Sequence, residues 1–425
     1  MAEANPSANN HLGRTLLLGL AAFTCYLSMY AFRKPFVAGT YEGDILLLGL
    51  ELKTLFVLSQ LVGYTLSKFI GTWWLTSKIG GNRFGLLIRL MLIAYLSLWA
   101  FYLLPTDSKA VAMLVNGLPL GMVWGIVVSY LEGRRNSDTL LVILAGSLIV
   151  ASSITKDSGL WLMTNLSIDE YLMPVAVATL FFPLLMFSAW WLERSPPPDQ
   201  ADVDERTIRT AMDAQSRILF TRHYWPGLLT LITAFVALTA YRDFRDNFGI
   251  DIIIDLGYAP QSGIFSLIDL PVAVVVLASL LIIQRIKNHR ESLLVLHALM
   301  ITGAVALIGS TVLMQMGVLS GLAWLILGGI GSFVAYIGYN TLLYERLMSH
   351  LKFPGTAIFA IYLSDAAGYS GSLLLQIYKD LFADNVSRLE FFVAMNYSLG
   401  ILISIALIHS AIYFLSSDRQ ELKAE

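Results

Sequence analysis

The first apolar run of the chain, residues 15–36, reads TLLLGLAAFTCYLSMYAFRKPF. A later run, residues 226–248, reads PGLLTLITAFVALTAYRDFRDNF. Both runs have the roughly 20 residues that a helix needs to cross a bilayer, and both end in Phe-Arg-x-x-Phe. The two arginines, Arg33 and Arg245, are 212 positions apart in a chain of 425 residues. This offset indicates two copies of one membrane-spanning unit.

The composition supports a lipid environment. Hydrophobic residues make up 56% of the chain and charged residues 14%, whereas an ordinary soluble domain has about 45–50% and about 25%. The net charge is −2, and no basic stripe is present that would neutralise phosphates of a nucleic acid. We therefore expect lipid, and not nucleic acid, around this protein.

Twelve segments are long and apolar enough to span a membrane as helices. Helices are expected because lipid does not satisfy open backbone groups and because no alternating barrel-strand pattern is present. The predicted spans are residues 15–36, 53–75, 84–104, 109–131, 139–163, 171–193, 226–248, 262–284, 292–313, 320–344, 354–377 and 389–415.

The longest polar stretch, residues 194–224, divides these spans six and six. The predicted organisation is a bundle over residues 1–193, a cytoplasmic linker over 194–224 and a bundle over 225–425. The offset of 212 also relates Ser158-Gly159 to Ser370-Gly371 on the corresponding spans. Lysine and arginine gather in the loops on the side of the two termini, so both termini are expected in the cytoplasm.

The first two spans carry polar side chains at helical spacing. Tyr26, Tyr30 and Arg33 are four and three residues apart, which would place two phenols and a guanidinium on one helical face suited to an oxyanion. In the second span, Tyr64 and Lys68 extend a polar stripe that begins at Gln60. A lysine whose ammonium reaches the cytoplasmic interface remains the alternative interpretation of Lys68.

The end of the seventh span is unusually rich in charge, with Arg242, Asp243, Arg245 and Asp246. The internal repeat makes Arg245 the counterpart of Arg33, and two arginines would bind one dianion. Either aspartate would instead neutralise Arg242 or Arg245 in a purely structural ion pair, and this alternative stays open.

Three more spans contain ionisable groups that are costly in lipid. Lys156 lies in the fifth span, Asp269 in the eighth and Asp365 in the eleventh. A buried carboxylate can carry a coupling proton, but it can equally form a structural pair with lysine or arginine. We therefore consider Asp269 and Asp365 as candidates for proton coupling, and Lys156 as a candidate for substrate binding.

The motifs of common enzymes and metal sites are missing from the sequence. No HExxH, GxSxG or P-loop pattern and no cluster of His, Cys and Asp is present, and Cys25 is the single cysteine. We expect no enzymatic activity, no metal and no cofactor.

Two of these motifs resemble a known family. Tyr26-xxx-Tyr30-xx-Arg33-Lys34 is similar to the first-helix signature of the organophosphate:phosphate antiporters, a branch of the major facilitator superfamily, and residues 64–69, YTLSKF, are similar to its second-helix motif. The resemblance implies that Arg33 and Arg245 hold the phosphate. It also implies that Tyr26, Tyr30, Tyr64 and Lys68 assist them, and that Lys156 stands where the glycerol-3-phosphate carriers have a histidine.

The sequence thus predicts an all-helical membrane protein of the major facilitator fold that moves a small, phosphorylated organic anion by alternating access. The resemblance implies an antiporter that acts as a monomer in a bacterial inner membrane. A proton-coupled carrier of another small solute and a non-transporting membrane sensor of the same fold remain the alternatives.

Overall fold

The computed structural model describes residues 6–41, 46–47, 49–78, 82–132, 134, 136–197, 214–351 and 357–416. The central part of the predicted linker, residues 198–213, lies outside them. Within this described part, helical residues fall in each of the twelve predicted spans, although the helix of the first span, 15–36, ends at Tyr30. Nine of the helices built from described residues are long and apolar enough to cross a membrane.

The contacts divide the chain into two units. Unit 1 contains residues 1–207 and 260–266, and unit 2 contains residues 208–259 and 267–425. The long helices of unit 1 are α1 (Pro6–Tyr30), α2 (Leu52–Lys78), α3 (Arg83–Leu103), α4 (Thr106–Ser129), α5 (Ser137–Leu166) and α6 (Met173–Arg194). A short 3-10 helix, η1 (Pro35–Ala38), follows α1, and β1 (Leu46–Leu47) pairs antiparallel with β2 (Leu50–Glu51) before α2.

Unit 2 repeats this order of helices. Its long helices are α8 (Ala214–Asn247), α10 (Ile264–Gln284), α11 (His289–Gln315), α12 (Gly321–Gly338), α14 (Ala357–Phe382) and α15 (Arg388–Leu415). The short helix α9 (Gly249–Asp255) follows α8, and a π-helical turn, η2 (Tyr339–Leu343), joins α12 to α13 (Tyr344–His350). Helix α10 begins among residues 260–266 of unit 1 and continues in unit 2.

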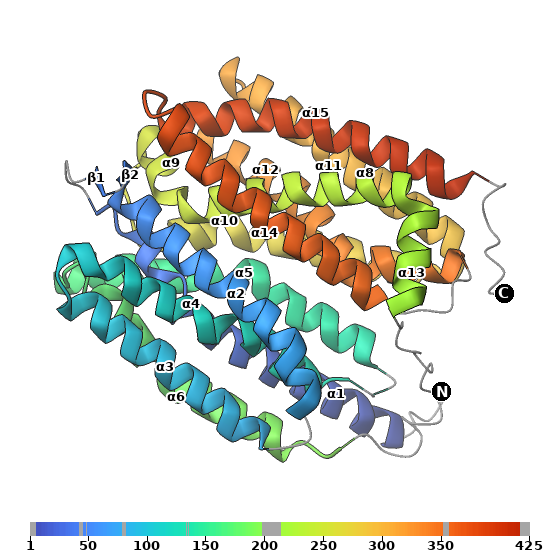
Figure 1. Ribbon diagram of the computed structural model, residues 1–425, viewed down its shortest axis with the longest axis horizontal. Coiled ribbons are helices and arrows are strands. Elements are labelled where there is room, and N and C mark those ends of the chain that lie inside the picture. The colour runs from blue at the N-terminus through green and yellow to red at the C-terminus, as the bar shows by residue number, and fades with distance from the viewer. Residues whose placement is uncertain are drawn as a thin grey trace. The chain divides into compact units, whose positions relative to one another are not determined.

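The packing inside the two units supports the internal repeat. In unit 1, α1 packs on α5 and α6, and α3 packs on α4 and α6 (Figure 1). The corresponding pairs recur in unit 2, where α8 packs on α14 and α15, and α11 packs on α12 and α15. Each unit buries its own apolar core, and the outward leucines, isoleucines and valines are exposed, as lipid-facing side chains require.

The segment that follows Arg33 is held firmly in unit 1. Phe36, Val37 and Tyr41 belong to one buried cluster with Phe56 of α2 and Phe101 of α3. The backbone N–H of Tyr41 donates to the Glu170 carboxylate (3.0 Å). Burial, with the nearby Glu170 charge, raises the pKa of the Tyr41 phenol well above its usual value, so this phenol stays neutral at physiological pH. These contacts hold the chain in place directly after Arg33, the first arginine of the internal repeat.

Candidate functional site

In unit 1 the site begins where α1 ends. The helix ends at Tyr30, and the N–H groups of Arg33 and Lys34 both donate to the Tyr30 carbonyl (2.9 Å each). The bond from Arg33 spans three residues, as in the 3-10 turns that are common at helix ends. Pro35, which has no N–H, starts η1. Arg33 therefore lies in a turn beyond the helix, which corrects the expectation of a single helical face.

Buried side-chain amides donate hydrogen bonds to backbone carbonyls that follow the end of α1 and have no partner within that helix. Gln60 of α2 donates to the Arg33 carbonyl (2.9 Å) and to the Asn116 side chain of α4 (2.7 Å). Asn116 donates in turn to the Phe32 carbonyl (3.2 Å) and to Ser97 of α3 (3.1 Å). Unsatisfied helix-end carbonyls are costly when buried. Gln60 therefore positions the Arg33 backbone, a role that the polar stripe did not predict.

Two cations meet at one tyrosine ring. The Arg33 guanidinium carbon lies 3.8 Å from the centre of the Tyr64 ring, and the Lys68 ammonium lies 5.4 Å from it. Arg33 is buried and Lys68 is partly exposed. Cation–π attraction contributes about 0.5–2 kcal/mol at such distances. The Tyr64 ring is thus in cation–π contact with two positively charged side chains of unit 1.

The remaining tyrosines of α1 extend this group. Arg33 also lies 5.8 Å from the Tyr30 ring, and Tyr30 contacts Tyr26 edge to face at 5.5 Å. Tyr26 contacts the Trp124 ring of α4 at 4.9 Å. The structure therefore brings together five of the predicted residues, and it adds Trp124, which carried no spacing signal in the sequence.

Two glycines of α4 allow the close approach of α2 that sets the position of Tyr64. A Cβ at Gly117 would clash with the Gln60 carbonyl and would lie 2.7 Å from the Tyr64 nitrogen. A Cβ at Gly121 would lie 2.6 Å from the Tyr64 carbonyl oxygen. Small residues allow helices to approach this closely in a membrane. The backbones of α2 and α4 are therefore in contact at the level of the two cations.

Lys156 of α5 has a different neighbour. It is buried, and its ammonium lies 4.2 Å from the Phe265 ring. The next residue, Asp157, accepts the N–H groups of Phe265 (3.1 Å) and Ser266 (2.7 Å), the first turn of α10. A carboxylate at a helix N-terminus satisfies open N–H groups and the helix dipole. These contacts give Asp157 a capping role and place Lys156 beside it.

In unit 2, Arg245 forms a buried ion pair. Its guanidinium donates to the Asp269 carboxylate of α10 (2.8 Å) and to the Leu325 carbonyl of α12 (3.3 Å). A Cβ at Gly329 would lie 2.9 Å from this guanidinium, so the glycine provides its space. The structural-pair alternative named Asp243 or Asp246, and the structure adds Asp269 of α10 as a partner of Arg245. A side chain of this length on α8 reaches across to the neighbouring helix.

Arg242 has the neighbouring aspartate as its partner. The guanidinium donates to one carboxylate oxygen of Asp243 through Nε (3.1 Å) and Nη2 (2.5 Å), and it lies 4.0 Å from the Tyr336 ring. The other Asp243 oxygen accepts from Ser372 of α14 (2.8 Å). Unlike Arg245, Arg242 is partly exposed.

Asp365 lies close to the π-helical turn. The residue before it, Ser364, shares a short hydrogen bond with the phenol of Tyr344, which follows that turn directly (2.5 Å). The Tyr339 hydroxyl of this turn donates to the Leu231 carbonyl (2.9 Å). Isolated π turns occur frequently at functional sites. The contacts described for the candidates of unit 2 thus centre on Arg245, on Arg242 and on the turn beside Asp365.

Among the described residues, no group of three or more His, Cys, Asp or Glu side chains gathers in a way that would hold a metal ion. Sequence reasoning also missed Asn116 and Ser372. Each is a polar residue inside an apolar span, and that anomaly is the signal by which they could have been found.

One family model matches residues 35–417, and its description reads "Family of unknown function (DUF5690)". The chain belongs to this family. No curated protein matches it. Among solved structures, the chain is similar to the crystal structure of a D-xylose-proton symporter, with a TM-score of 0.62 and 12% sequence identity over 93% of this chain and 96% of that chain.

This likeness shows the fold. The DUF5690 chain has the major facilitator fold predicted from its sequence, and with its long apolar helices it is a multi-pass membrane protein. The narrower resemblance to the organophosphate:phosphate antiporters stays a prediction, as do the roles of its site residues.

Proposed function

We propose that this protein is a secondary active transporter of a small organic anion, that the anion is phosphorylated, and that it moves by alternating access. The observation on which the proposal rests is that Arg33 and Lys68 both lie beside the ring of Tyr64. Two positively charged side chains beside one ring make this part of unit 1 positive, and a charge acts strongly in a medium of low dielectric constant. An anion that contacts both would be strongly favoured there.

The chemistry of the group suits a phosphate ester. Arginine presents a planar fork that matches phosphate oxygens, and lysine adds a mobile point charge. The phenols of Tyr26, Tyr30 and Tyr64 can donate further hydrogen bonds. A carboxylate offers fewer oxygens to these donors, so we expect the phosphate ester to bind more tightly.

A proton-coupled carrier is the second candidate. The specific observation in its favour is that two buried aspartates of unit 2, Asp243 and Asp269, are each bonded to an arginine. Protonation of either carboxylate would release its arginine, which is a means of linking a proton to transport. The solved relative is itself described as a proton symporter, for D-xylose.

The first experiment is a thermal-shift screen of the purified full chain against phosphate esters, carboxylates and D-xylose. Ligand at about 100 times its Kd stabilises the folded state by about 2.7 kcal/mol. We expect a shift with phosphate esters that is larger than the shift with carboxylates. A shift with D-xylose alone would overturn the anion proposal.

The second experiment is uptake of the best ligand into proteoliposomes. An antiporter requires a counter-anion such as inorganic phosphate inside the vesicle, whereas a proton-coupled carrier responds to an imposed pH gradient. Binding without uptake under either condition would identify a sensor and would contradict transport.

A further inference from the structure

The turn between α10 and α11 is held by an arginine of α13. Arg346 donates to the carbonyl of Gln284, the last residue of α10 (3.1 Å), and to Nδ1 of His289, the first residue of α11 (3.3 Å). A guanidinium has only donors, so His289 accepts this bond and carries its own proton on Nε2. Arg346 therefore lies beside the residues next to Gln284 and His289, which are Arg285 and Arg290.

The three arginines at this turn are not neutralised by an ion pair within the described part of the chain. Arg290 donates to the Leu415 carbonyl at the end of α15 (3.4 Å), and both Arg285 and Arg290 are exposed. The carboxylate of the neighbouring Glu291 accepts a hydrogen bond from Asn288 (3.1 Å). Arginines that lack a counter-ion make this turn a positive surface that attracts anions.

Exposed aliphatic side chains lie one helical turn from two of these arginines. Ile282 is three residues before Arg285 and is 66% exposed, and Leu294 is four residues after Arg290 and is 53% exposed. Residues at these spacings share a helix face. Both α10 and α11 are long and apolar enough to cross a membrane. Each arginine therefore stands where the exposed apolar face of a membrane helix ends, at the level of lipid headgroups.

We propose that the turn between α10 and α11 binds the headgroup of an anionic phospholipid. Arg285 and Arg290 contact the headgroup phosphate, because a guanidinium matches phosphate oxygens, and the acyl chains lie along Ile282 and Leu294. Clusters of basic residues at the ends of membrane helices attract anionic lipids in this way. A soluble phosphate has the same headgroup chemistry but makes no use of the exposed aliphatic faces. The site contains none of the residues of the proposed anion site and is independent of transport.

The test is a thermal-shift titration of the purified full chain in detergent with three probes. Phosphatidylglycerol and phosphatidylcholine with identical acyl chains differ in net charge, and glycerol phosphate carries the phosphate without acyl chains. We expect phosphatidylglycerol to raise the melting temperature, because a lipid that binds the folded state stabilises it, and phosphatidylcholine to raise it much less. The phosphatidylglycerol shift should shrink as salt is added, because salt screens exposed charges.

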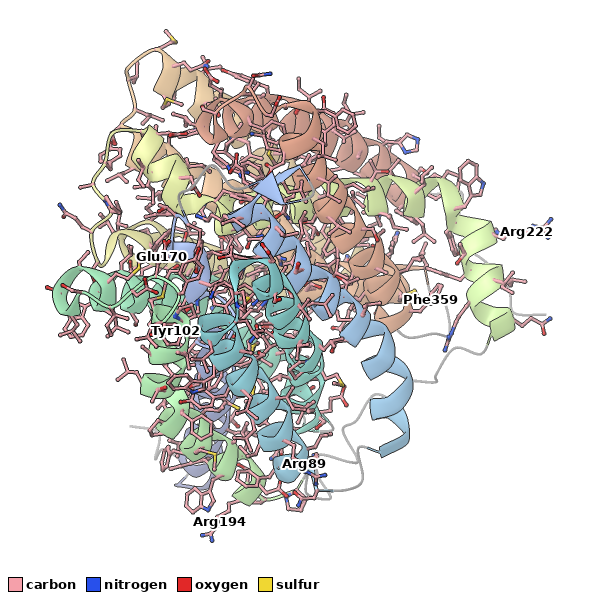
Figure 2. The ribbon with its side chains drawn as sticks, turned by 60° about the vertical axis from the view of Figure 1, so that its left-hand side comes forward. Arg89, Tyr102, Glu170, Arg194, Arg222 and Phe359 are labelled. Atoms are coloured by element: carbon pink, nitrogen blue, oxygen red, sulfur yellow. The ribbon has the colours of Figure 1, made fainter. Side chains whose placement is uncertain are left out.

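The decisive variant combines Arg285→Gln with Arg290→Gln. Each lost arginine should weaken phosphatidylglycerol binding by about fivefold, and both together by roughly 25-fold. The matched control combines Arg89→Gln with Arg222→Gln, two exposed arginines in different units (Figure 2), and should bind this lipid as the wild type does. Arg285→Gln alone tests the proposal if the double variant does not fold, because the Arg285 side chain has no hydrogen bond to any described residue.

Three results would overturn the lipid site. Equal shifts with phosphatidylglycerol and phosphatidylcholine would show that the headgroup charge is not recognised. An equal loss of phosphatidylglycerol binding in the decisive and the control variants would show a general effect of net charge. A glycerol phosphate shift that the decisive variant abolishes would assign the turn to a soluble anion. None of these results bears on Arg33 and Lys68, so the proposed transport function is tested separately.

Discussion

At the scale of single residues, Arg33 is the side chain on which the proposed function chiefly depends. Its planar guanidinium lies against the Tyr64 ring at 3.8 Å. Arg33→Lys keeps the charge but loses the planar fork, so we expect it to weaken phosphate-ester binding nearly as much as Arg33→Ala. Thermal-shift titration measures both. Arg89→Lys, at an exposed arginine of α3, is the control and should bind normally.

Lys68 provides the second charge at the same ring. Lys68→Ala should weaken anion binding by about tenfold, because one charge-assisted contact contributes on the order of 1.5 kcal/mol, while the melting temperature without ligand stays close to the wild-type value. Lys287→Ala, at an exposed lysine, is the matched control. An unchanged affinity in folded Lys68→Ala would show that this ammonium only reaches the membrane interface.

Arg245 is expected to act differently from its repeat counterpart. Removing one member of a buried pair costs about 3–5 kcal/mol because the other charge is left buried. Arg245→Ala and Asp269→Ala should each lower stability strongly, and the double variant should be more stable than the sum of the two losses predicts. Melting and anion binding are measured on all four proteins. A stable Arg245→Ala protein that no longer binds the anion would instead place Arg245 in the binding site, as the resemblance implies.

At the scale of helices, the contact between α2 and α4 sets the position of Tyr64. Gly117→Ala would put a Cβ against the Gln60 carbonyl, and overpacking of this kind costs typically about 1–3 kcal/mol. We expect lower stability and weaker anion binding, since Tyr64 must move. Gly125→Ala in the same helix meets no atom within 4 Å and should be tolerated in both assays. Equal effects of the two substitutions would contradict the close backbone contact.

The ends of two helices explain why the repeat was informative but incomplete. Phe-Arg-x-x-Phe ends both α1 and α8 in the sequence, yet α1 stops at Tyr30 while α8 continues to Asn247. Pro35 accounts for the early end of the first helix. The equivalent position on α8 is Asn247, which permits a helix. The two equivalent arginines therefore differ in backbone conformation: Arg33 lies in a turn and Arg245 lies in a helix. They also contact different partners.

At the scale of the whole molecule, the orientation in the membrane is the prediction to check. Figure 2 shows Arg89 and Arg194 toward one end of unit 1, and Tyr102 and Glu170 toward the other. Positive side chains favour the cytoplasm. The single native cysteine, Cys25, is buried, so an introduced cysteine can be labelled selectively. Glu170→Cys should react with a membrane-impermeant maleimide in intact cells, and Arg194→Cys only after permeabilisation; the reverse pattern would invert the predicted map.

Much of the molecule followed from the sequence by itself. A protein that spans lipid as helices needs long apolar segments. The length of these segments and the spacing between them can be read from the sequence. The major facilitator fold was predictable for this reason and is confirmed. Of the helices built from described residues, nine are long and apolar enough to cross a membrane. Helical spacing predicted the neighbouring positions of Tyr26 and Tyr30 and the stripe that joins Tyr64 to Lys68. The approach of Arg33 to the Tyr64 ring of another helix was implied only by the resemblance.

Only the tertiary structure decided which partner each charge has. A guanidinium on one helix can reach carboxylates on several others, and the choice depends on how closely the helices approach and where glycines make room. Arg245 reaches Asp269 beside Gly329, and Asp243 is held from α14 by Ser372. These contacts join residues far apart in the chain. The spacing of residues along one helix does not predict these contacts, because they form only when the helices of a unit pack together.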